Sequence, residues 1–536
     1  MAGNEERRRP CDDLTDPLAP EDLPPPPLDD CTVLAEPWEP DGGPEASCEA
    51  EVPPDDEPPS PEAQPPPVDP DPGEEEPWPE ERCTDLGNAR RLVRAHGRDF
   101  RHCPDLGNKV SWLMWVVRRW EPDVKLEIDR RAKTVPGMIR RDAMRAQRLG
   151  HEKLSDDLFK HADRSENERG RRDMLLSARS EPGIAVVAGE LDRDPRLFNV
   201  ENGTLDLRTG RLRRHARRDL ITKIAPVVYR PEAQAPTWLA FLDRIFPGDP
   251  EMVAFLQRLA GYVLEGGNPE QVFVFFQGPG ANGKSTFVEV IRAILGDYVA
   301  SAPTQVFTDH NDGSVARSAA VADLAGARLV TLAELREGQT LDEALVKSVT
   351  GGEPIKCCFK FGPWFEYQPQ FTPWLSTNPL PRVLGTDDGI WRRLLLVQFN
   401  ECIPKREQDP ELVKKLRREG AGIFAWVVEG HRQWREQGLN PPRAVLEATA
   451  AWRGEEDTVG TFVAECCECS PSASVENGAL YEAYVLWCRE HHHKPVGTQK
   501  FKPRLEDLGF EQKRGAQRYW PGLAVLPAAN GAHFNA

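Results

Sequence analysis

The stretch from Gln271 to Ile294 constrains the fold of this chain more than any other. It opens with an almost unbroken apolar run, Gln271 to Phe276, which is typical of a strand buried on both faces of a parallel sheet. A glycine-rich loop follows that matches G-x-x-x-x-G-K-[ST] without a mismatch. Apolar residues then recur at helical spacing; they are Phe287, Val290, Ile291, Ile294 and Leu295. The sequence therefore predicts a strand, a phosphate-binding loop and a helix.

The loop residues suit phosphate chemistry. Glycines let backbone N–H groups close around phosphate oxygens, and a helix N-terminus favours negative charge there. Lys284 is expected to reach the β- and γ-phosphates, and the Ser285 hydroxyl to bind Mg²⁺. The predicted nucleotide-binding residues are Gly278, Pro279, Gly280, Ala281, Asn282, Gly283, Lys284, Ser285 and Thr286. The loop thus predicts a nucleoside-triphosphate site.

The net charge of −18 is spread unevenly along the 536 residues. Residues 1–80 contain 25 acidic residues, three arginines and 22 prolines. Because such a segment cannot bury enough apolar surface to offset its ordering entropy, residues 1–82 are predicted to be a disordered tail, either solubilising or docking. The rest of the chain has 65 basic and 61 acidic residues, so its net charge of +4 is compatible with nucleic-acid binding.

The twelve cysteines are scattered, and no segment resembles a signal peptide or a membrane span of roughly 20 apolar residues. We therefore expect a reducing, cytoplasmic environment and no membrane partner.

Mixed helices and strands are predicted before the phosphate loop. Thr84 looks like a helix start, and the Trp112 to Trp120 stretch looks like a strand. Residues 130–179 are strongly charged and are predicted to be helical, with a solvated arginine-rich face as the default interpretation. Residues 198–212 predict short strands joined by Asn-Gly and Thr-Gly turns, and residues 238–263 predict a helical segment.

Two further strands are predicted to end in polar side chains. The run from Arg328 to Glu334 is an apolar strand followed by a carboxylate, which is where a nucleotide-binding sheet places an acid that orients Mg²⁺ and water. The run from Phe371 to Asn378 ends in an amide that could hold the attacking water or the γ-phosphate. An ordinary turn before Pro379 is the alternative for Asn378.

Basic residues follow in two places. Residues 350–360 predict a turn and a hairpin that carries Lys356 and Lys360. Arg392 and Arg393 stand at the start of a predicted strand, where either could reach a phosphate as a finger from a neighbouring subunit. Pairing with surface acids is the alternative for these two arginines.

This order of features resembles superfamily 3 helicases, and within them the phage/plasmid primase-helicases that include the poxvirus-type proteins. Similar segments extend from about residue 84 to 525; they include Asp85–Ala89, Asn202–Leu207, Gln257–Tyr262, Phe462, Tyr484, Trp487 and Trp520. The resemblance implies an α/β, AAA+-like core (residues 236–455), an α/β N-terminal accessory domain (83–235) and a C-terminal winged helix (456–536).

The resemblance also implies a function. Such proteins form hexameric rings that hydrolyse ATP with Mg²⁺ and move along DNA during replication of a phage, virus, plasmid or integrated element. It assigns catalytic roles to Lys284, Glu334, Asn378 and Arg393, with Arg392 a near equal, and Mg²⁺ binding to Ser285 and Glu334. DNA, as single strand and fork, would contact Lys356 and Lys360. A separate primase or replication protein is an expected partner.

Three departures from the family pattern matter. No polymerase-like module occupies residues 1–82, so primer synthesis by this chain is not expected. A single acid, Glu334, stands where many relatives have two, and Cys358 occupies a hairpin position where relatives tend to have arginine. A primase-helicase with its own priming site, and an ATP-gated DNA-loading or origin-binding protein that does not translocate, remain alternatives.

The C-terminal residues carry two more signals. Basic residues that could contact DNA phosphates cluster there; they are Lys500, Lys502, Arg504, Lys513, Arg514 and Arg518. Cys466, Cys467, Cys469, Cys488 and His491 to His493 have ligand types that suit Zn²⁺, but their spacing is not that of a C-x₂-C pair with a matching second pair. We expect Cys466 and Cys488 to pack as small apolar side chains instead.

Overall fold

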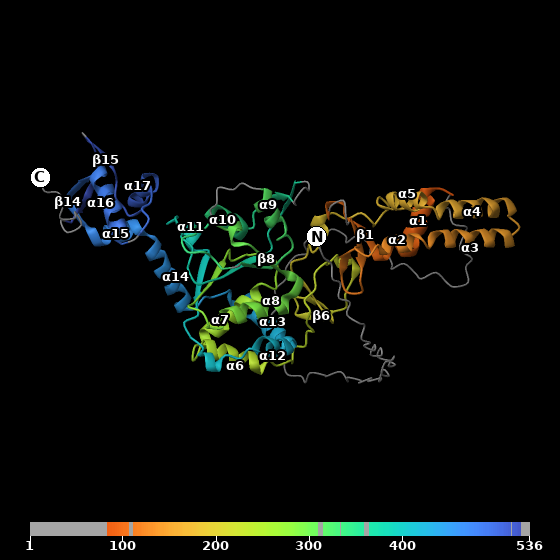
Figure 1. The fold of residues 1–536 in the computed structure, drawn as a ribbon, viewed down its shortest axis with the longest axis horizontal. Helices are drawn as coiled ribbons and strands as arrows, with labels where there is room; N and C mark the ends of the chain where they lie inside the picture. Colours follow the sequence, from red (N-terminus) through yellow and green to blue (C-terminus); the bar gives the residue numbers. More distant parts are fainter. Residues whose placement is uncertain are drawn as a thin grey trace, which may run out of the picture. The chain divides into compact units, whose positions relative to one another are not determined.

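The computed structural model describes residues 83–106, 111–308, 315–332, 334–358, 364–491, 493–515 and 517–526 (Figure 1). The predicted tail, residues 1–82, lies outside the described residues. No helix among those described is both long enough and apolar enough to cross a bilayer.

The N-terminal residues form a helical region with a small antiparallel sheet, ordered β1-β2-β3. Its elements are α1 Asp85–His96, β1 Phe100–His102, β2 Trp112–Trp115, β3 Trp120–Pro122, α2 Glu127–Ala132, α3 Val135–Arg148, α4 Glu152–Ser165 and α5 Glu168–Ala178. Thr84 caps α1 as predicted, because its hydroxyl accepts a hydrogen bond from the Gly87 N–H at 3.1 Å. The stretch from Trp112 to Trp120 is not one strand, since the chain turns where the Val116 N–H donates to the Arg119 carbonyl at 2.9 Å.

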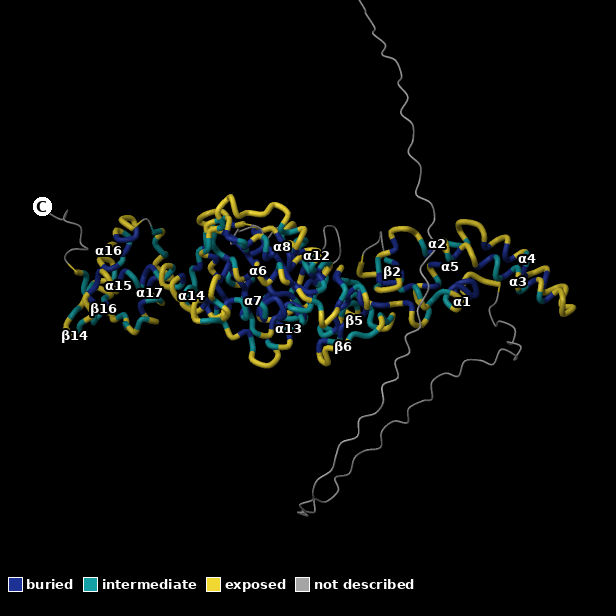
Figure 2. Tube along the Cα trace, turned by 90° about the horizontal axis from the view of Figure 1, so that it is seen from below, coloured by how far each residue is buried: buried dark blue, intermediate teal, exposed yellow. Residues whose placement is uncertain are grey.

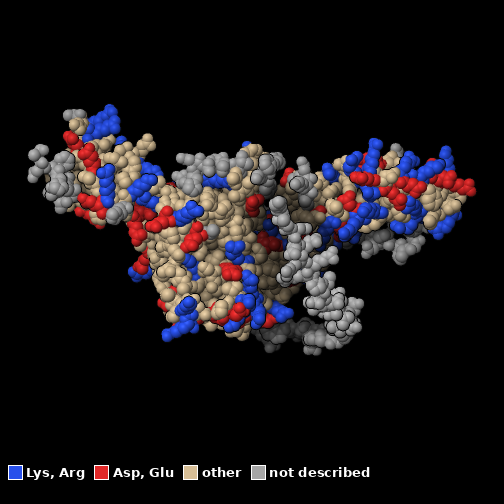
Figure 3. All heavy atoms as spheres, in the orientation of Figure 1, with Lys and Arg blue, Asp and Glu red and all other residues tan. Residues whose placement is uncertain are grey.

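The charged helices have a solvated face, as the default interpretation held. Figure 3 shows Lys and Arg alternating with Asp and Glu over this region. Arg140 on α3, for example, pairs with Asp163 and Glu166 of the following helix and its end, at 2.9 and 2.5 Å. Arginines that are already paired with neighbouring acids leave little net positive charge for DNA.

The predicted short strands form a second antiparallel sheet, β4 Leu197–Val200, β5 Gly203–Asp206 and β6 Arg211–Arg213. Phe198 of β4 stacks on Tyr298 with ring centroids 4.2 Å apart, and the Tyr298 hydroxyl accepts a hydrogen bond from the Asn199 N–H at 2.9 Å. Through these contacts the sheet packs on the segment that follows the helix after the phosphate loop.

The central part is built on a five-stranded sheet in the order β13-β7-β12-β9-β8, with every neighbouring pair parallel. Its strands are β7 Phe273–Gln277, β8 Val299–Ala302, β9 Leu329–Leu332, β12 Thr372–Thr377 and β13 Leu394–Gln398. A separate hairpin consists of β10 Ile355–Cys358 and β11 Trp364–Tyr367. The helices are α6 Pro236–Ile245, α7 Pro250–Tyr262, α8 Lys284–Leu295, α9 Val315–Ala322, α10 Glu343–Gly351, α11 Asp388–Trp391, α12 Leu412–Arg418, α13 Gly420–Gln437 and α14 Arg443–Glu456.

Strand β7 shows why the sheet is buried on both faces. Val274 and Phe276 join a core cluster with residues of α7, α8 and α13, whereas Phe273 and Phe275 join a second cluster with Val346 of α10. Successive side chains of a strand point to opposite faces, so an unbroken apolar run requires cover on both sides. Helices α7 and α13, which pack on each other, show this burial in Figure 2.

The C-terminal part has α15 Thr458–Cys466, β14 Cys467–Glu476, α16 Asn477–Glu490, α17 Thr498–Asp507, β15 Lys513–Arg514 and β16 Arg518–Val525. The strands form an antiparallel sheet in the order β14-β16-β15. Cys466 and Cys488 are buried in its core beside Phe462 and Trp520, which confirms their predicted packing. Within the described residues, no group of three His, Cys, Asp or Glu side chains could hold a metal ion.

Candidate nucleotide-binding site

The phosphate loop joins β7 to α8 in a conformation that requires glycine. Gly280 and Gly283 have φ values of 87° and 82°, in the left-handed region that other residues rarely adopt. At Gly283 an added Cβ would lie 2.5 Å from Ile245 Cγ2, and at Gly278 it would lie 2.0 Å from Asn282 Nδ2. Space and backbone angle therefore both select glycine, and the close approach keeps the loop against α6.

Asn282 ties the loop to the rest of the sheet. Its side-chain Nδ2 donates to the Phe399 carbonyl at 3.0 Å, and its Oδ1 accepts from the Lys284 N–H at 3.3 Å. The Ile403 N–H also donates to the Ala281 carbonyl at 2.8 Å. These bonds fix the loop to the segment that leaves β13, so its shape is set by more than its own glycines.

The partners that the described part of the chain gives the Lys284 ammonium are all neutral oxygens. Its Nζ donates to the Thr377 carbonyl and to Asn378 Oδ1 at 2.9 Å each, and to the Gly278 carbonyl at 3.3 Å. Burial lowers the pKa of Lys284, and the negative charge of Glu334 opposes that shift. A desolvated cation without a carboxylate in contact is well prepared to receive an anionic ligand.

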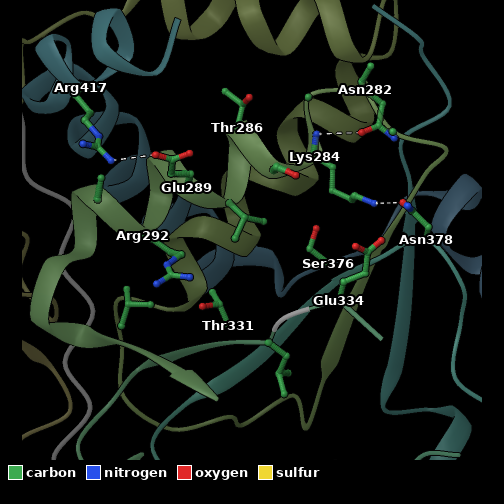
Figure 4. A pocket seen from close by; sticks show the side chains of 18 of the residues that line it. Asn282, Lys284, Thr286, Glu289, Arg292, Thr331, Glu334, Ser376, Asn378 and Arg417 are labelled. Carbon is green, nitrogen blue, oxygen red and sulfur yellow. Dashed lines mark hydrogen bonds and ion pairs between the residues drawn. The ribbon is translucent and has the colours of Figure 1, made fainter. Parts of the chain in front are cut away.

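A cavity of about 950 Å³ opens in front of the loop (Figure 4). The predicted site residues that line it are Gly280, Ala281, Asn282, Gly283, Lys284, Ser285, Thr286, Glu334 and Asn378. Gly278 and Pro279 do not line it. Its volume falls in the range of small-molecule and cofactor sites.

Glu334 and Asn378 reach this cavity as predicted, because their strands are parallel to β7. Strand β12 lies between β7 and β9, so the chain leaves all three strands at one edge of the sheet. Glu334 follows β9 and is exposed, and Asn378 follows β12. The carboxyl edge of such a sheet is where ligands bind in open α/β folds.

Five polar or charged side chains that the sequence analysis did not single out also line the cavity: Glu289, Arg292, Thr331, Ser376 and Arg417. Arg417 of α12 pairs with Glu289 of α8 at 3.0 Å, and Arg292 donates to the Ser301 hydroxyl at 2.7 Å. Strand alternation could have indicated Ser376, which stands two residues before Asn378. Nothing in the sequence near α8 indicates that α12 approaches it.

Arg392 and Arg393 lie at the opposite edge of the sheet from the cavity. They precede β13, and the Phe273 N–H at the start of β7 donates to the Arg393 carbonyl at 2.7 Å. The buried Arg393 guanidinium donates to the Thr350 hydroxyl at 3.0 Å and to the Gly389 carbonyl. The exposed Arg392 donates to Gln271 Oε1 at 2.6 Å. Among the described residues neither guanidinium is paired with a carboxylate, contrary to the surface-acid alternative.

The predicted DNA-binding lysines lie outside the cavity. Lys356 is exposed on β10, where it faces Glu366 across the β10–β11 hairpin. Lys360 lies outside the described residues. In the C-terminal part, Lys500, Lys502, Lys513, Arg514 and Arg518 are exposed. Arg504 differs, because its guanidinium forms two hydrogen bonds with the Asp457 carboxylate at 3.0 and 2.6 Å and is not free for a phosphate.

A second cavity, of about 690 Å³, lies between the β4–β6 sheet and α13. Glu265 accepts hydrogen bonds there from Arg196 at 3.0 Å and from His431 at 3.2 Å. Although burial raises its pKa, these two partners prevail and hold the pKa of Glu265 at about 2. The arginines of its rim are likewise paired, Arg208 with Asp194 and Arg432 with Glu429.

The fold and the loop together define a mixed α/β protein whose five-stranded parallel sheet carries a phosphate-loop motif. Family models match three parts of the chain. Residues 89–247 match "D5 N terminal like", residues 276–393 match a family of unknown function, and residues 454–520 match "Poxvirus D5 protein-like". The chain thus carries two D5-like domains, which agrees with the predicted resemblance to the poxvirus-type primase-helicases.

Several proteins of large DNA viruses are similar to the chain. "Putative helicase L207/L206" of Acanthamoeba polyphaga mimivirus is 27% identical over 56% of this chain and 34% of its own length. "Putative helicase 022R" of Frog virus 3 is 27% identical over 54% and 31%, and "Putative primase C962R" of African swine fever virus is 23% identical over 55% and 34%. The chain therefore spans about a third of the length of these relatives.

One solved structure, the apo C-terminal region of NrS-1, aligns with 82% of this chain and all of its own chain at 12% identity. Its TM-score of 0.42 is too low to support an argument about function.

Proposed function

We propose that the chain is an ATP-dependent DNA helicase of the hexameric superfamily 3 type, acting in the replication of a virus or a related element. One observation carries the proposal: Lys284 at the start of α8 meets Glu334 and Asn378, which follow the neighbouring parallel strands β9 and β12, at one cavity. A lysine, a carboxylate and an amide at a phosphate loop are the parts that phosphoryl transfer to water requires. The names of the viral relatives agree with this reading.

The proposed chemistry assigns one task to each group. Lys284 neutralises the β- and γ-phosphates, because its ammonium is already desolvated and held by neutral oxygens. Oxygen donors that suit Mg²⁺ line the same cavity, namely the Ser285 hydroxyl and the Glu334 carboxylate. Mg²⁺ bound there with the nucleotide would neutralise charge that develops on the phosphates. Asn378 would orient water or the γ-phosphate once the nucleotide displaces it from Lys284.

The proposed motor is a ring in which one subunit's arginine completes the site of its neighbour. Arg392 and Arg393 lie at the sheet edge opposite the phosphate loop, so they cannot serve the cavity of their own chain. A finger supplied from a neighbouring subunit meets that geometry. We also propose the boundaries 83–235, 236–455 and 456–536 for the accessory, motor and DNA-binding domains.

DNA contacts are proposed at the β10–β11 hairpin and in the C-terminal part, which we interpret as a winged helix. The exposed Lys513, Arg514 and Arg518 of its β15–β16 hairpin, with Lys500 and Lys502 on α17, support this interpretation. Contacts of this kind release counterions, so affinity for DNA should fall by about 0.7–0.9 log units per log unit of salt for each contact.

A strand-displacement assay on a forked duplex tests the proposal. The wild-type chain should separate the strands with ATP and Mg²⁺ and not without them, and Lys284→Ala should separate none. DNA-stimulated ATP hydrolysis without strand displacement would instead favour the loading or origin-binding alternative. Absence of any ATP hydrolysis would contradict both.

A further inference from the structure

Three hydroxyl side chains lie at the carboxyl edge of β9 and β12, and one of them differs from the others. Thr377 donates to the Pro379 carbonyl at 2.8 Å, and Thr331 donates to the Ala300 carbonyl at 3.4 Å. The Ser376 hydroxyl has no hydrogen bond to any residue in the described part of the chain, although it lines the cavity. Its donor and its acceptor sites are therefore available to a ligand.

Strand geometry aims Ser376 at the first turn of α8. Trp374, two residues earlier on β12, stacks on Phe287 of α8 with ring centroids 6.1 Å apart. Side chains two residues apart share a face of a strand, so Ser376 also faces α8 but lies nearer the carboxyl edge, where α8 begins. Figure 4 shows Ser376 and Glu334 both turned into the cavity below Lys284.

The register of the sheet places Ser376 one residue beyond the last pair between β12 and β9, at the edge where Glu334 follows β9. Leu375 of β12 pairs with Leu332, the last residue of β9, and the next residue along β12 is Ser376. Glu334 is followed by Leu335, so the sequence after β9 supplies one carboxylate rather than two adjacent ones. Mg²⁺ binds octahedrally and keeps several waters, and those waters need hydrogen-bond acceptors in fixed positions.

We propose that Ser376 is a positioning residue for Mg²⁺: its hydroxyl accepts a hydrogen bond from a water of the metal and leaves Glu334 free to orient the attacking water. The inference rests on the proposed nucleotide site. It identifies a hydroxyl on β12 as the group that substitutes for a second carboxylate on β9. The Thr331 hydroxyl cannot do the same without giving up its bond to Ala300.

Binding of Mn²⁺ in the presence of ADP tests this assignment without catalysis, because free Mn²⁺ is counted directly by electron paramagnetic resonance. Ser376→Ala should weaken Mn²⁺ binding about tenfold, the lower end of the usual effect of losing an outer-shell partner. Its affinity for ADP in EDTA should equal that of the wild type. Ser376→Asp should tighten Mn²⁺ binding, and Thr331→Val, which removes a hydroxyl from the same cavity, should leave it unchanged.

Each outcome is decisive once far-UV circular dichroism shows that the variants are folded. Equal Mn²⁺ affinity of the wild type and Ser376→Ala, with ADP bound, would overturn the role of Ser376 alone. If Ser376→Ala were unfolded, Ser376→Cys, which keeps the size but lacks the oxygen, should give the same tenfold loss, and wild-type affinity would refute the assignment. Failure of the wild type to bind ADP would refute the proposed function instead.

Discussion

The phosphate-loop cavity and the cavity beside α13 both contain buried or half-buried cations, but they hold them in opposite ways. At the phosphate loop, Lys284 is surrounded by two carbonyl oxygens and one amide oxygen. In the cavity beside α13, the cations meet carboxylates: Glu265 lies between Arg196, His431 and Arg435 at 3.0, 3.2 and 3.9 Å. The first arrangement leaves positive charge uncompensated by any contacting acid, and the second neutralises it.

This difference separates a binding site from a structural junction. Neutral oxygens orient an ammonium without cancelling its charge, so an incoming phosphate gains the full electrostatic attraction. A carboxylate that accepts several charge-assisted bonds would have to be displaced by a ligand, which costs more than the ligand regains. The adjacent residues Arg392 and Arg393, which precede β13, resemble Lys284 in this respect. Neutral oxygens of Thr350, Gly389 and Gln271 contact their guanidinium groups.

The arginine pair should therefore give the largest effect in the molecule. We expect replacement of the finger, Arg393→Ala or Arg392→Ala, to leave ATP binding intact and to slow hydrolysis by roughly 10³–10⁵-fold. The two variants differ in a second measurement. Arg393→Ala should also lower the melting temperature, because it removes a buried guanidinium bonded to Thr350, whereas the exposed Arg392 contributes little to stability.

Mixing the subunits distinguishes a shared site from a local one. A chain that lacks the finger, blended with Lys284→Ala, should regain some turnover where an intact loop meets an intact arginine. Well-mixed rings without any recovery, or full activity from a proven monomer, would rule out the shared site.

Lys284→Ala should reduce ATP hydrolysis by about 10²–10³-fold, since removal of one preorganised donor at the developing charge has effects of that size. The pH dependence sharpens this test. Burial lowers the pKa of Lys284, so its ammonium loses its proton at a lower alkaline pH than that of an exposed lysine. Nucleotide affinity should therefore be highest below that pKa and should fall as the pH rises through it. Lys284→Arg keeps its charge at high pH, so its nucleotide affinity should not show this alkaline loss; the same loss in both chains would assign it to another group.

The sequence predicts the phosphate-loop cavity much better than the cavity beside α13. The loop, Glu334 and Asn378 were predictable because each follows an apolar strand, and parallel strands bring their carboxyl ends to one edge. The pairing of Glu265 with His431 was not, because it joins residues 166 positions apart on different elements. Short-range sequence patterns also did not predict the turn at Val116. Nor did they predict that the Arg504 guanidinium is hydrogen-bonded to the Asp457 carboxylate.

Glu265→Gln should lower stability and leave ATP hydrolysis unchanged. The pKa of Glu265 is depressed to about 2 in the folded chain. Its carboxylate therefore contributes fully to the free energy of unfolding above its ordinary pKa of 4.5, and this contribution is lost as the pH falls towards 2. The variant should be destabilised at neutral pH by about 1–3 kcal/mol, because His431 and Arg196 lose a charged partner. Its unfolding midpoint should also vary less than that of the wild type between pH 4.5 and 2.

The exposed Glu436, at the rim of the same cavity, provides the matched control: Glu436→Gln should show neither change. A loss of ATP hydrolysis in Glu265→Gln with unchanged stability would mean that the α13 cavity serves the reaction and is not only a junction.

Arg432→Gln should have the smallest effect. Its guanidinium is exposed and pairs with Glu429 at 2.6 Å and with Glu436 on the same helix face, and exposed pairs of this kind contribute little. We expect unchanged hydrolysis and an unchanged melting temperature. The decisive measurement is calorimetric titration with pyrophosphate in a Lys284→Ala background, where the phosphate loop no longer competes for the anion. Carboxylates that already neutralise its arginines should prevent binding there. If pyrophosphate bound the Lys284→Ala chain and Arg432→Gln abolished that binding, paired arginines would be as available to phosphate as the unpaired lysine, and the contrast between the cavities would fail.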